Sequence, residues 1–211
     1  MPDHSHSALL VVDSQTGAIT SDFWGTARSN PSYERNVTKI LSAFRAFPKS
    51  HESPHIIHIY HSSLNASSPL HPSSAGMSFH TSSLPQEGEP VISKSTNSAF
   101  ITPELERLLR EREIWKVYFI GLSVDLCLGS TIRSASDLGV ADHTDEEGNL
   151  IKGDIILVED ATAAWAKKDG NFDAETVHGV HVESLKGEFA RILNTEQVVS
   201  EMGYHGIAKT A

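Results

Sequence analysis

The sequence ALLVVD, at residues 8–13, is a continuous apolar run that stops at an aspartate. Runs of this kind are typical of strands buried on both faces, as the strands of parallel sheets are. Three similar runs follow along the chain, together with two shorter candidates. The runs are residues 55–60, 117–120 and 155–158, and the shorter candidates are residues 91–92 and, as a final edge strand, residues 197–199. The sequence therefore predicts about six strands.

Helical patterns separate these runs. Apolar residues recur at helical spacing in residues 31–47, 102–109, 127–138 and 177–192, the last as one long final helix. Pro31 favours a helix start at the first of these segments, and Gly139 favours an end after the third. Strands that alternate with helices imply right-handed crossovers and a mostly parallel sheet with helices on both faces. We therefore predict a doubly wound, Rossmann-like α/β fold.

Composition places the chain of 211 residues among ordinary globular proteins, with 39% hydrophobic and 21% charged residues, and its length favours one domain. Asp and Glu outnumber Lys and Arg by 27 to 17, which gives a formal net charge of −10. This charge argues against nucleic acid or an anionic membrane as the main partner. The run at residues 8–12 is too short for a membrane span or a signal sequence. Cys127 is the single cysteine, which fits a reducing, cytoplasmic location.

Two stretches predict loops. Residues 62–88 are rich in Ser, Pro and His and lack periodicity, which usually marks a functional loop or lid. A lid and a subunit interface are both open for this segment. Residues 142–153 are acidic and contain a Gly-Asn pair, and we expect a surface hairpin or insertion there.

Three polar residues lie where strands are predicted to end, which is where doubly wound sheets bind ligands. Asp13 follows the first run, Lys94 follows residues 91–92, and Cys127 opens a predicted helix after the run at residues 117–120. A helix N-terminus and a nearby ammonium both favour a thiolate, so we expect a Cys127 pKa below the ordinary value of about 8.5. A nucleophile, a base and a cation are together what covalent acyl transfer needs. A buried cysteine, a turn-capping aspartate and a solvated lysine are the structural alternatives.

With these positions in view, the sequence resembles the isochorismatase-like superfamily of cysteine hydrolases. Five segments carry the resemblance, in the order that the family has them. They are LLVVDSQ at 9–15, SPLHP at 68–72 with Gly76, PVISK at 90–94 with SAF at 98–100, GLSVDLC at 121–127 with Thr131 and residues 137–139, and VEDATA at 158–163. The resemblance extends over about residues 8–199, and it implies a single hydrolase domain over residues 1–211.

The resemblance implies a catalytic triad of Asp13, Lys94 and Cys127. In that triad the cysteine attacks a carbonyl carbon and forms a thioester, the aspartate moves the proton, and the lysine orients the carboxylate. The resemblance also implies a cis peptide bond between Leu122 and Ser123. The backbone N–H groups of Ser123 and Cys127 would form the oxyanion hole.

Members of this superfamily differ in chemistry, so the fold does not fix the substrate. Nicotinamidase-type members carry an Asp-x-His metal motif after the second strand, whereas this chain has YHSSL at residues 60–64. We therefore expect no metal and no cofactor. The presence of Cys127 favours hydrolysis of a carboxamide, ureido or lactam bond in a small molecule. Vinyl-ether hydrolysis with Asp13 as general acid, and a non-catalytic role as an interaction protein, are the alternatives.

Five further residues near the predicted rim are candidate substrate contacts: Gln15, Phe23, Trp24, His61 and Trp165. Aromatic residues commonly wall binding pockets, but core or subunit-interface positions fit these three aromatics equally well. Gln15 could instead fix the turn after the first strand, and His61 could instead be an ordinary loop histidine. Resemblance to the superfamily also leads us to expect a homodimer or homotetramer.

Overall fold

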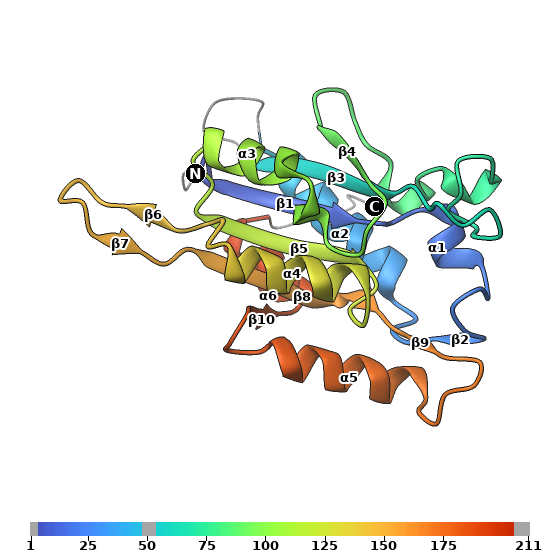
Figure 1. Ribbon diagram of the computed structural model, residues 1–211. Helices are drawn as coiled ribbons and strands as arrows, with labels where there is room; N and C mark the ends of the chain where they lie inside the picture. The colour runs from blue at the N-terminus through green and yellow to red at the C-terminus, as the bar shows by residue number, and fades with distance from the viewer. Residues whose placement is uncertain (1–3, 48–53, 205–211) are drawn as a thin grey trace, which may run out of the picture.

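A six-stranded sheet forms the centre of the molecule (Figure 1). The computed structural model describes residues 4–47 and 54–204. The strands of the sheet are β1 (Ser7–Val12), β3 (His55–His61), β4 (Val91–Lys94), β5 (Lys116–Leu122), β8 (Asp154–Ala163) and β10 (Arg191–Leu193). They lie in the order β10-β8-β5-β1-β3-β4, and all neighbouring strands are parallel. The predicted doubly wound α/β fold is confirmed.

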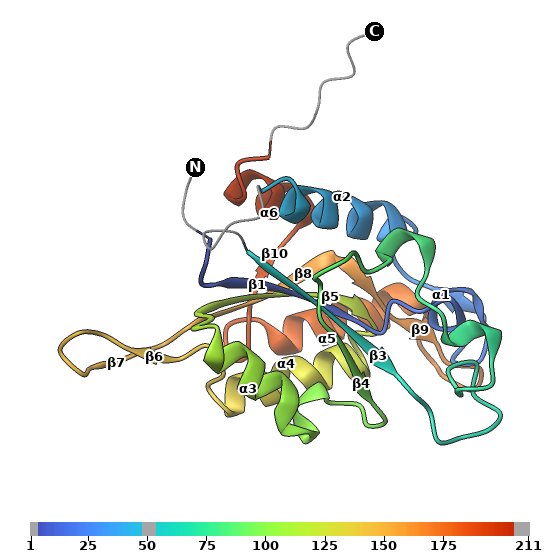
Figure 2. The ribbon, with the colours of Figure 1, turned by 90° about the horizontal axis from the view of Figure 1, so that it is seen from above.

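Helices cover both faces of this sheet (Figure 2). One face carries α2 (Tyr33–Arg45) and α6 (Thr195–Glu201), and the other carries α3 (Pro103–Glu111), α4 (Cys127–Asp137) and α5 (Ala174–Leu185). The remaining elements are short. They are α1 (Thr16–Thr20), the antiparallel pairs β2 (Ala27–Arg28) with β9 (Trp165–Ala166) and β6 (His143–Thr144) with β7 (Leu150–Ile151), and the 3-10 turns η1 (Ala75–Met77), η2 (Thr81–Ser83) and η3 (Ala99–Ile101).

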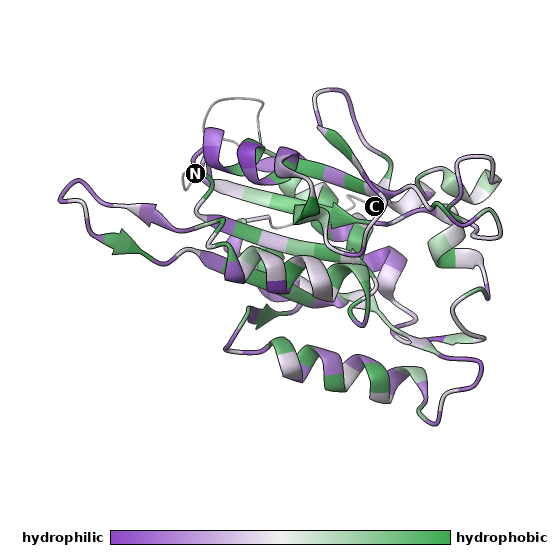
Figure 3. Ribbon diagram, viewed as in Figure 1, coloured by the Kyte–Doolittle hydropathy of each residue, from purple (hydrophilic) through white to green (hydrophobic). Residues whose placement is uncertain are grey.

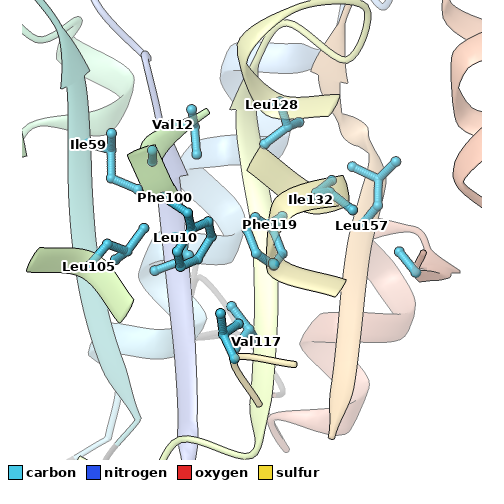
Figure 4. Packing of buried hydrophobic residues seen from close by; sticks show 14 of the residues in the cluster. Leu10, Val12, Ile59, Phe100, Leu105, Val117, Phe119, Leu128, Ile132 and Leu157 are labelled. Atoms are coloured by element: carbon cyan, nitrogen blue, oxygen red, sulfur yellow. The ribbon is translucent and has the colours of Figure 1, made fainter. Parts of the chain in front are cut away.

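Strand β1 shows why its sequence is apolar at every position. Leu10 and Val12 belong to the core under α3 and α4, whereas Leu9 and Val11 belong to the core under α2 and α6. Successive strand residues point to opposite faces, so a strand covered on both sides needs an apolar side chain at each step. Figure 4 shows Leu10 beside Phe119 of β5 and Val12 further along β1, and Figure 3 shows mostly hydrophobic residues along the central strands.

Two expectations about the C-terminal region are wrong. Residues 197–199 lie in helix α6 and not in an edge strand, because Asn194 and Gln197 cap this helix reciprocally through side chain and backbone. The long helix expected to reach residue 192 ends at Leu185. Gly187 then adopts a left-handed φ of 81°, a conformation that commonly follows helix ends. The chain thereby turns back into β10, which pairs with β8.

The two predicted loops have different structures. Residues 142–153 contain the β6–β7 hairpin, which projects from one end of the molecule (Figure 1). Residues 62–88 hold only the turns η1 and η2 and pack tightly against α1. A Cβ atom on Gly76 would stand 2.8 Å from Cα of Gly17 in α1, so this contact requires glycine. Across the two described ranges, no helix combines the length and apolar character that crossing a membrane requires.

Candidate active site

Strands β1 and β5 form the switch point of the fold. From β1 the chain continues outward to β3 and β4, and from β5 it continues in the other direction to β8 and β10. Asp13 follows β1 directly, and Cys127 opens helix α4 after β5. The strands approach closely here, because a Cβ atom on Gly121 would lie 1.9 Å from the Val12 carbonyl oxygen. The fold thus brings the predicted carboxylate and thiol to the edge where such sheets bind ligands.

Lys94 reaches Asp13 across the end of β3. It ends the edge strand β4 and is paired in register with His61, the last residue of β3. Its Nζ lies 2.7 Å from Asp13 Oδ2, 3.2 Å from His61 Nδ1 and 3.1 Å from the Thr96 carbonyl oxygen. The side chains of Lys94 and Asp13 are 1% and 3% exposed. Removal of either charge would leave the other buried and unpaired, which is strongly destabilising.

The Asp13 carboxylate keeps one oxygen available. Its Oδ2 is held by Lys94, whereas its Oδ1 is buried and has no hydrogen-bond partner among the described residues. A carboxylate oxygen of Asp13, a ring nitrogen of His61 and Sγ of Cys127 all lie within 4.8 Å of one another. The site therefore holds a proton acceptor with an open lone pair next to a thiol.

The thiol itself is protonated in the resting site. Burial raises the pKa of Cys127 above its ordinary value, and the Asp13 carboxylate raises it further, while Lys94 offsets only part of the increase. The expected lowering of this pKa by the helix start and Lys94 is therefore wrong. The reason is that the thiol is largely enclosed beside a negative charge. Sγ lies 3.5 Å from Asn97 Oδ1, so the thiol donates weakly to this amide.

His61 is a neutral histidine with a defined tautomer. Burial, and then the Lys94 ammonium, lower the pKa of His61 below 6.5. An ammonium can only donate hydrogen bonds, so Nδ1, at 3.2 Å from Lys94 Nζ, is the acceptor. The ring proton is then on Nε2. Nδ1 lies 4.0 Å from Cys127 Sγ, which places the imidazole beside both the thiol and the ion pair.

A cavity of about 150 Å³ opens beside these groups. Four of the five candidate substrate contacts line it: Phe23, Trp24, His61 and Trp165. Gln15 does not line it. This residue is fully buried, and its side chain binds the backbone of His61 and the Met77 carbonyl. Gln15 therefore fixes the loop behind the site, which is the structural role that the sequence left open.

Sequence reasoning missed several polar residues of the cavity wall. These are Ser63, Asn65, Ser68 and Asn97. The first three belong to residues 62–88, the segment singled out as a functional loop, so their region but not their identity was predicted. Asn97 follows Lys94 by three residues in a turn without periodicity, which gives no signal of its proximity to Cys127.

The cluster of Asp13, His61 and Cys127 has the donor atoms of a metal site. The ammonium of Lys94 already occupies its centre, because it binds Asp13 Oδ2 and His61 Nδ1. A metal ion would have to displace a buried lysine from both ligands. The donor set fits a proton-transfer site better than a metal centre.

The turn before Cys127 exposes two backbone donors. The bond between Leu122 and Ser123 is cis, as the resemblance implies. Hydrogen bonds within and around the turn use the N–H groups of Val124, Leu126 and Leu128. Within residues 4–47 and 54–204, no protein acceptor engages the N–H of Ser123 or of Cys127. Both residues line the cavity.

Comparison with known proteins agrees with this geometry. The isochorismatase domain model matches residues 7–197. The isochorismatase family protein YrdC of Bacillus subtilis is 34% identical over 197 residues, which cover 92% of this chain and 95% of YrdC. Ureidoacrylate amidohydrolase RutB of Klebsiella pneumoniae is 31% identical over 99 residues, which cover 45% of this chain and 36% of RutB.

Solved structures share the fold over nearly the whole chain. An isochorismatase-family protein from Chromobacterium violaceum has a TM-score of 0.80 at 30% identity, covering 96% of this chain and 99% of that one. A cysteine hydrolase from Pseudomonas syringae pv. phaseolicola has a TM-score of 0.77 at 19% identity, covering 96% and 94% of the two chains, a likeness of fold. The chain therefore belongs to the isochorismatase family of hydrolases.

Proposed function

We propose that this protein is a cysteine hydrolase that cleaves a C–N bond of a small molecule through a thioester on Cys127. The bond is a carboxamide, ureido or lactam bond. One observation carries the proposal. The buried Asp13 carboxylate is paired with Lys94 through Oδ2, and its Oδ1 has no partner among the described residues. The same carboxylate lies within 4.8 Å of the Cys127 thiol.

The raised pKa of the Cys127 thiol supports a role for Cys127 as the nucleophile and for Asp13 as its base. Because Cys127 holds its proton in the resting state, a base has to remove that proton as Sγ attacks the carbonyl carbon. Asp13 has an oxygen without a partner, and its carboxylate lies within 4.8 Å of the thiol. The S–C bond forms as the proton moves to Asp13, and the carbonyl oxygen becomes an oxyanion.

Collapse of this intermediate breaks the C–N bond. Asp13 returns its proton to the departing nitrogen, which leaves as ammonia or an amine, and the acyl group remains on Sγ as a thioester. A water molecule then attacks the thioester while Asp13 accepts the water proton. The acid leaves, and the proton restores the thiol. Lys94 orients the Asp13 side chain through both steps, because its Nζ lies 2.7 Å from Oδ2.

The oxyanion is the charge that this site has to stabilise. The N–H groups of Ser123 and Cys127 have no protein acceptor in the described ranges, and both residues line the cavity. Such donors are commonly worth a factor of about 10²–10³ in rate. The partial similarity to a ureidoacrylate amidohydrolase also supports C–N bond cleavage by a related sequence.

The experiment is ammonia release from a panel of small amides, combined with intact-protein mass spectrometry. A Cys127→Ala variant is expected to lose turnover, and wild-type protein quenched in acid is expected to carry one acyl group. Asp142→Asn is the matched control for Asp13→Asn, because Asp142 pairs with Lys152 beside the β6–β7 hairpin. Vinyl-ether hydrolysis that survives in Cys127→Ala but not in Asp13→Asn would overturn the thioester mechanism. Absence of any turnover would favour an interaction protein.

A further inference from the structure

The cavity beside Cys127 has a charge pattern that narrows the substrate class. Of the described residues that line it, Asp13 alone has a charged side chain. His61 is neutral, because burial and Lys94 lower its pKa. The other polar groups are uncharged hydroxyls, amides and indoles, together with the Cys127 thiol.

Lys94 pairs with Asp13 beside the cavity, and it has no donor to spare. An ammonium has three N–H bonds, and Nζ of Lys94 has three acceptors within 3.2 Å, on Asp13, His61 and Thr96. Its side chain is 1% exposed. A substrate carboxylate could therefore gain a hydrogen bond from Lys94 only by breaking one of these.

An anionic substrate would meet a further penalty in this cavity. A carboxylate that leaves water without a cationic partner loses its hydration, which is costly. It would also approach the Asp13 carboxylate, and like charges repel strongly where water is excluded. An uncharged substrate meets neither cost.

The cavity walls suit a small apolar body. Phe23, Trp24 and Trp165 supply aromatic surface, and Leu70, Leu122 and Leu126 supply aliphatic surface. The volume of about 150 Å³ equals that of an apolar protein cavity that holds one benzene molecule. The space therefore matches one six-membered ring or an aliphatic chain of similar size.

We propose that the substrate of the amidohydrolase activity, on which this inference rests, is an uncharged carboxamide with an apolar body of about one ring. Amides that carry a carboxylate are rejected. The similarity to ureidoacrylate amidohydrolase, whose named substrate carries a carboxylate, then extends to the reaction and not to the charge of the substrate.

The test compares two amides of nearly the same shape, 4-oxopentanamide and succinamate, in which a methyl group replaces a charged oxygen. Benzamide is the cyclic reference. With wild-type protein, kcat/KM for succinamate is expected to be at least 100-fold below that for 4-oxopentanamide. Values within threefold of each other, or a preference for succinamate, would overturn the proposal.

A charge introduced at the cavity wall sharpens the test. Asn65→Lys is expected to raise the ratio of succinamate to 4-oxopentanamide turnover at least tenfold. Asn149→Lys, which adds the same charge on the β6–β7 hairpin, is the control and is expected to leave the ratio unchanged. An equal rise in both variants would overturn the assignment of this cavity as the substrate site.

Calorimetric binding of both amides to Cys127→Ala separates this inference from the proposed function. Preferential binding of 4-oxopentanamide without wild-type turnover would support the substrate class and overturn the hydrolase function alone. Turnover of both amides at equal rates would support the function and overturn the substrate class. Binding of neither amide would overturn the inference.

Discussion

Two buried clusters in this protein contain the same three ingredients, a carboxylate, a basic side chain and a histidine. One lies at the carboxyl ends of the strands, and the other joins α2 and β3 to the segment before β4. Their members are Asp13, Lys94 and His61 in the first cluster, and Glu89, Arg45 and His58 in the second. The clusters differ in how fully the carboxylate is satisfied.

The Glu89 carboxylate has partners on both oxygens. Oε1 accepts from Arg45 Nε at 2.7 Å, and Oε2 accepts from Arg45 Nη2, His58 Nε2 and the Gln86 N–H at 2.7–2.8 Å. Burial raises the pKa of Glu89, but the hydrogen bonds from Arg45, His58 and Gln86 outweigh it and hold the pKa at about 2. Both oxygens of this carboxylate are engaged, and its partners come from three segments of the chain. We therefore expect Glu89 to have a structural role.

The Asp13 carboxylate has a partner on one oxygen only. The comparison teaches that composition does not separate a structural cluster from a chemical one. The two clusters are distinguished instead by the buried Asp13 oxygen that has no partner and belongs to a carboxylate beside a thiol. A buried acceptor without a hydrogen bond destabilises the fold, so its presence calls for a functional explanation.

The largest expected effect is on catalysis. Asp13→Asn keeps the shape of the side chain and removes the base, and we expect kcat to fall by about 10³–10⁴-fold. Glu89→Gln, the corresponding change in the other cluster, is expected to leave kcat within about threefold. Steady-state ammonia release measures both. Equal losses in the two variants would remove the distinction between the clusters.

The next effect is on the stability of the second cluster. Glu89→Gln removes the charge that pairs with Arg45, and we expect the free energy of unfolding at pH 7 to fall by roughly 3 kcal/mol. Urea denaturation measures it. Glu111→Gln is the control, since Glu111 pairs with Arg107 on the exposed face of α3, and it should change stability little. A Glu89→Gln protein as stable as this control would contradict the structural role.

The lowered pKa of Glu89 predicts the pH range in which this residue stabilises the folded protein. The pKa of Glu89 is about 2 in the folded protein and 4.5 for an ordinary glutamate, so its contribution is complete above pH 4.5. As the pH falls from 4.5 towards 2, the unfolded chain binds a proton first and the contribution is lost. The difference in unfolding free energy between wild type and Glu89→Gln should therefore shrink across this window. A constant difference would show that the charge of Glu89 is not responsible.

The smallest effect concerns the histidine of the first cluster. Because the pKa of His61 is lowered, the imidazole stays neutral until the pH falls below 6.5, and protonation then places two cations together. We expect kcat/KM to decline on the acid side with a midpoint below 6.5. His61→Asn should lower kcat/KM about tenfold, the worth of one hydrogen bond, and should remove this decline. A pH–rate profile with the same acid limb in the variant would assign the titration to another group.

The sequence predicted the parts of the fold that depend on local patterns. The run at residues 8–12 is a strand because both of its faces are buried, and its apolar composition shows this directly. Residues 198–199 are also apolar, yet the Asn194–Gln197 cap places them in a helix. Short apolar runs do not distinguish strand from helix. The capping residues Asn194 and Gln197 were the part of the sequence that indicated a helix.

The sequence was enough to predict which residues come together at the site, but not the direction of the Cys127 pKa shift. Asp13 and Cys127 follow central strands, whereas Lys94 ends a four-residue edge strand. All three were singled out by their places after apolar runs, and the resemblance then implied that they act as a triad. The direction of the Cys127 pKa depends on how deeply the thiol is enclosed and on the distance to Asp13. Neither quantity can be read from residue order. The oligomeric state and the cellular location stay predictions.

The protonated state of Cys127 has a consequence for chemical probes. Peroxide and iodoacetamide react with thiolates, so the resting protein should be labelled slowly although the cysteine borders an open cavity. A survey of reactive cysteines would then overlook Cys127, the proposed nucleophile. Electrophiles shaped like the substrate, such as small apolar nitriles or aldehydes, place their carbon where Asp13 can take the proton during attack. Selectivity towards this enzyme would therefore come from shape and not from intrinsic reactivity.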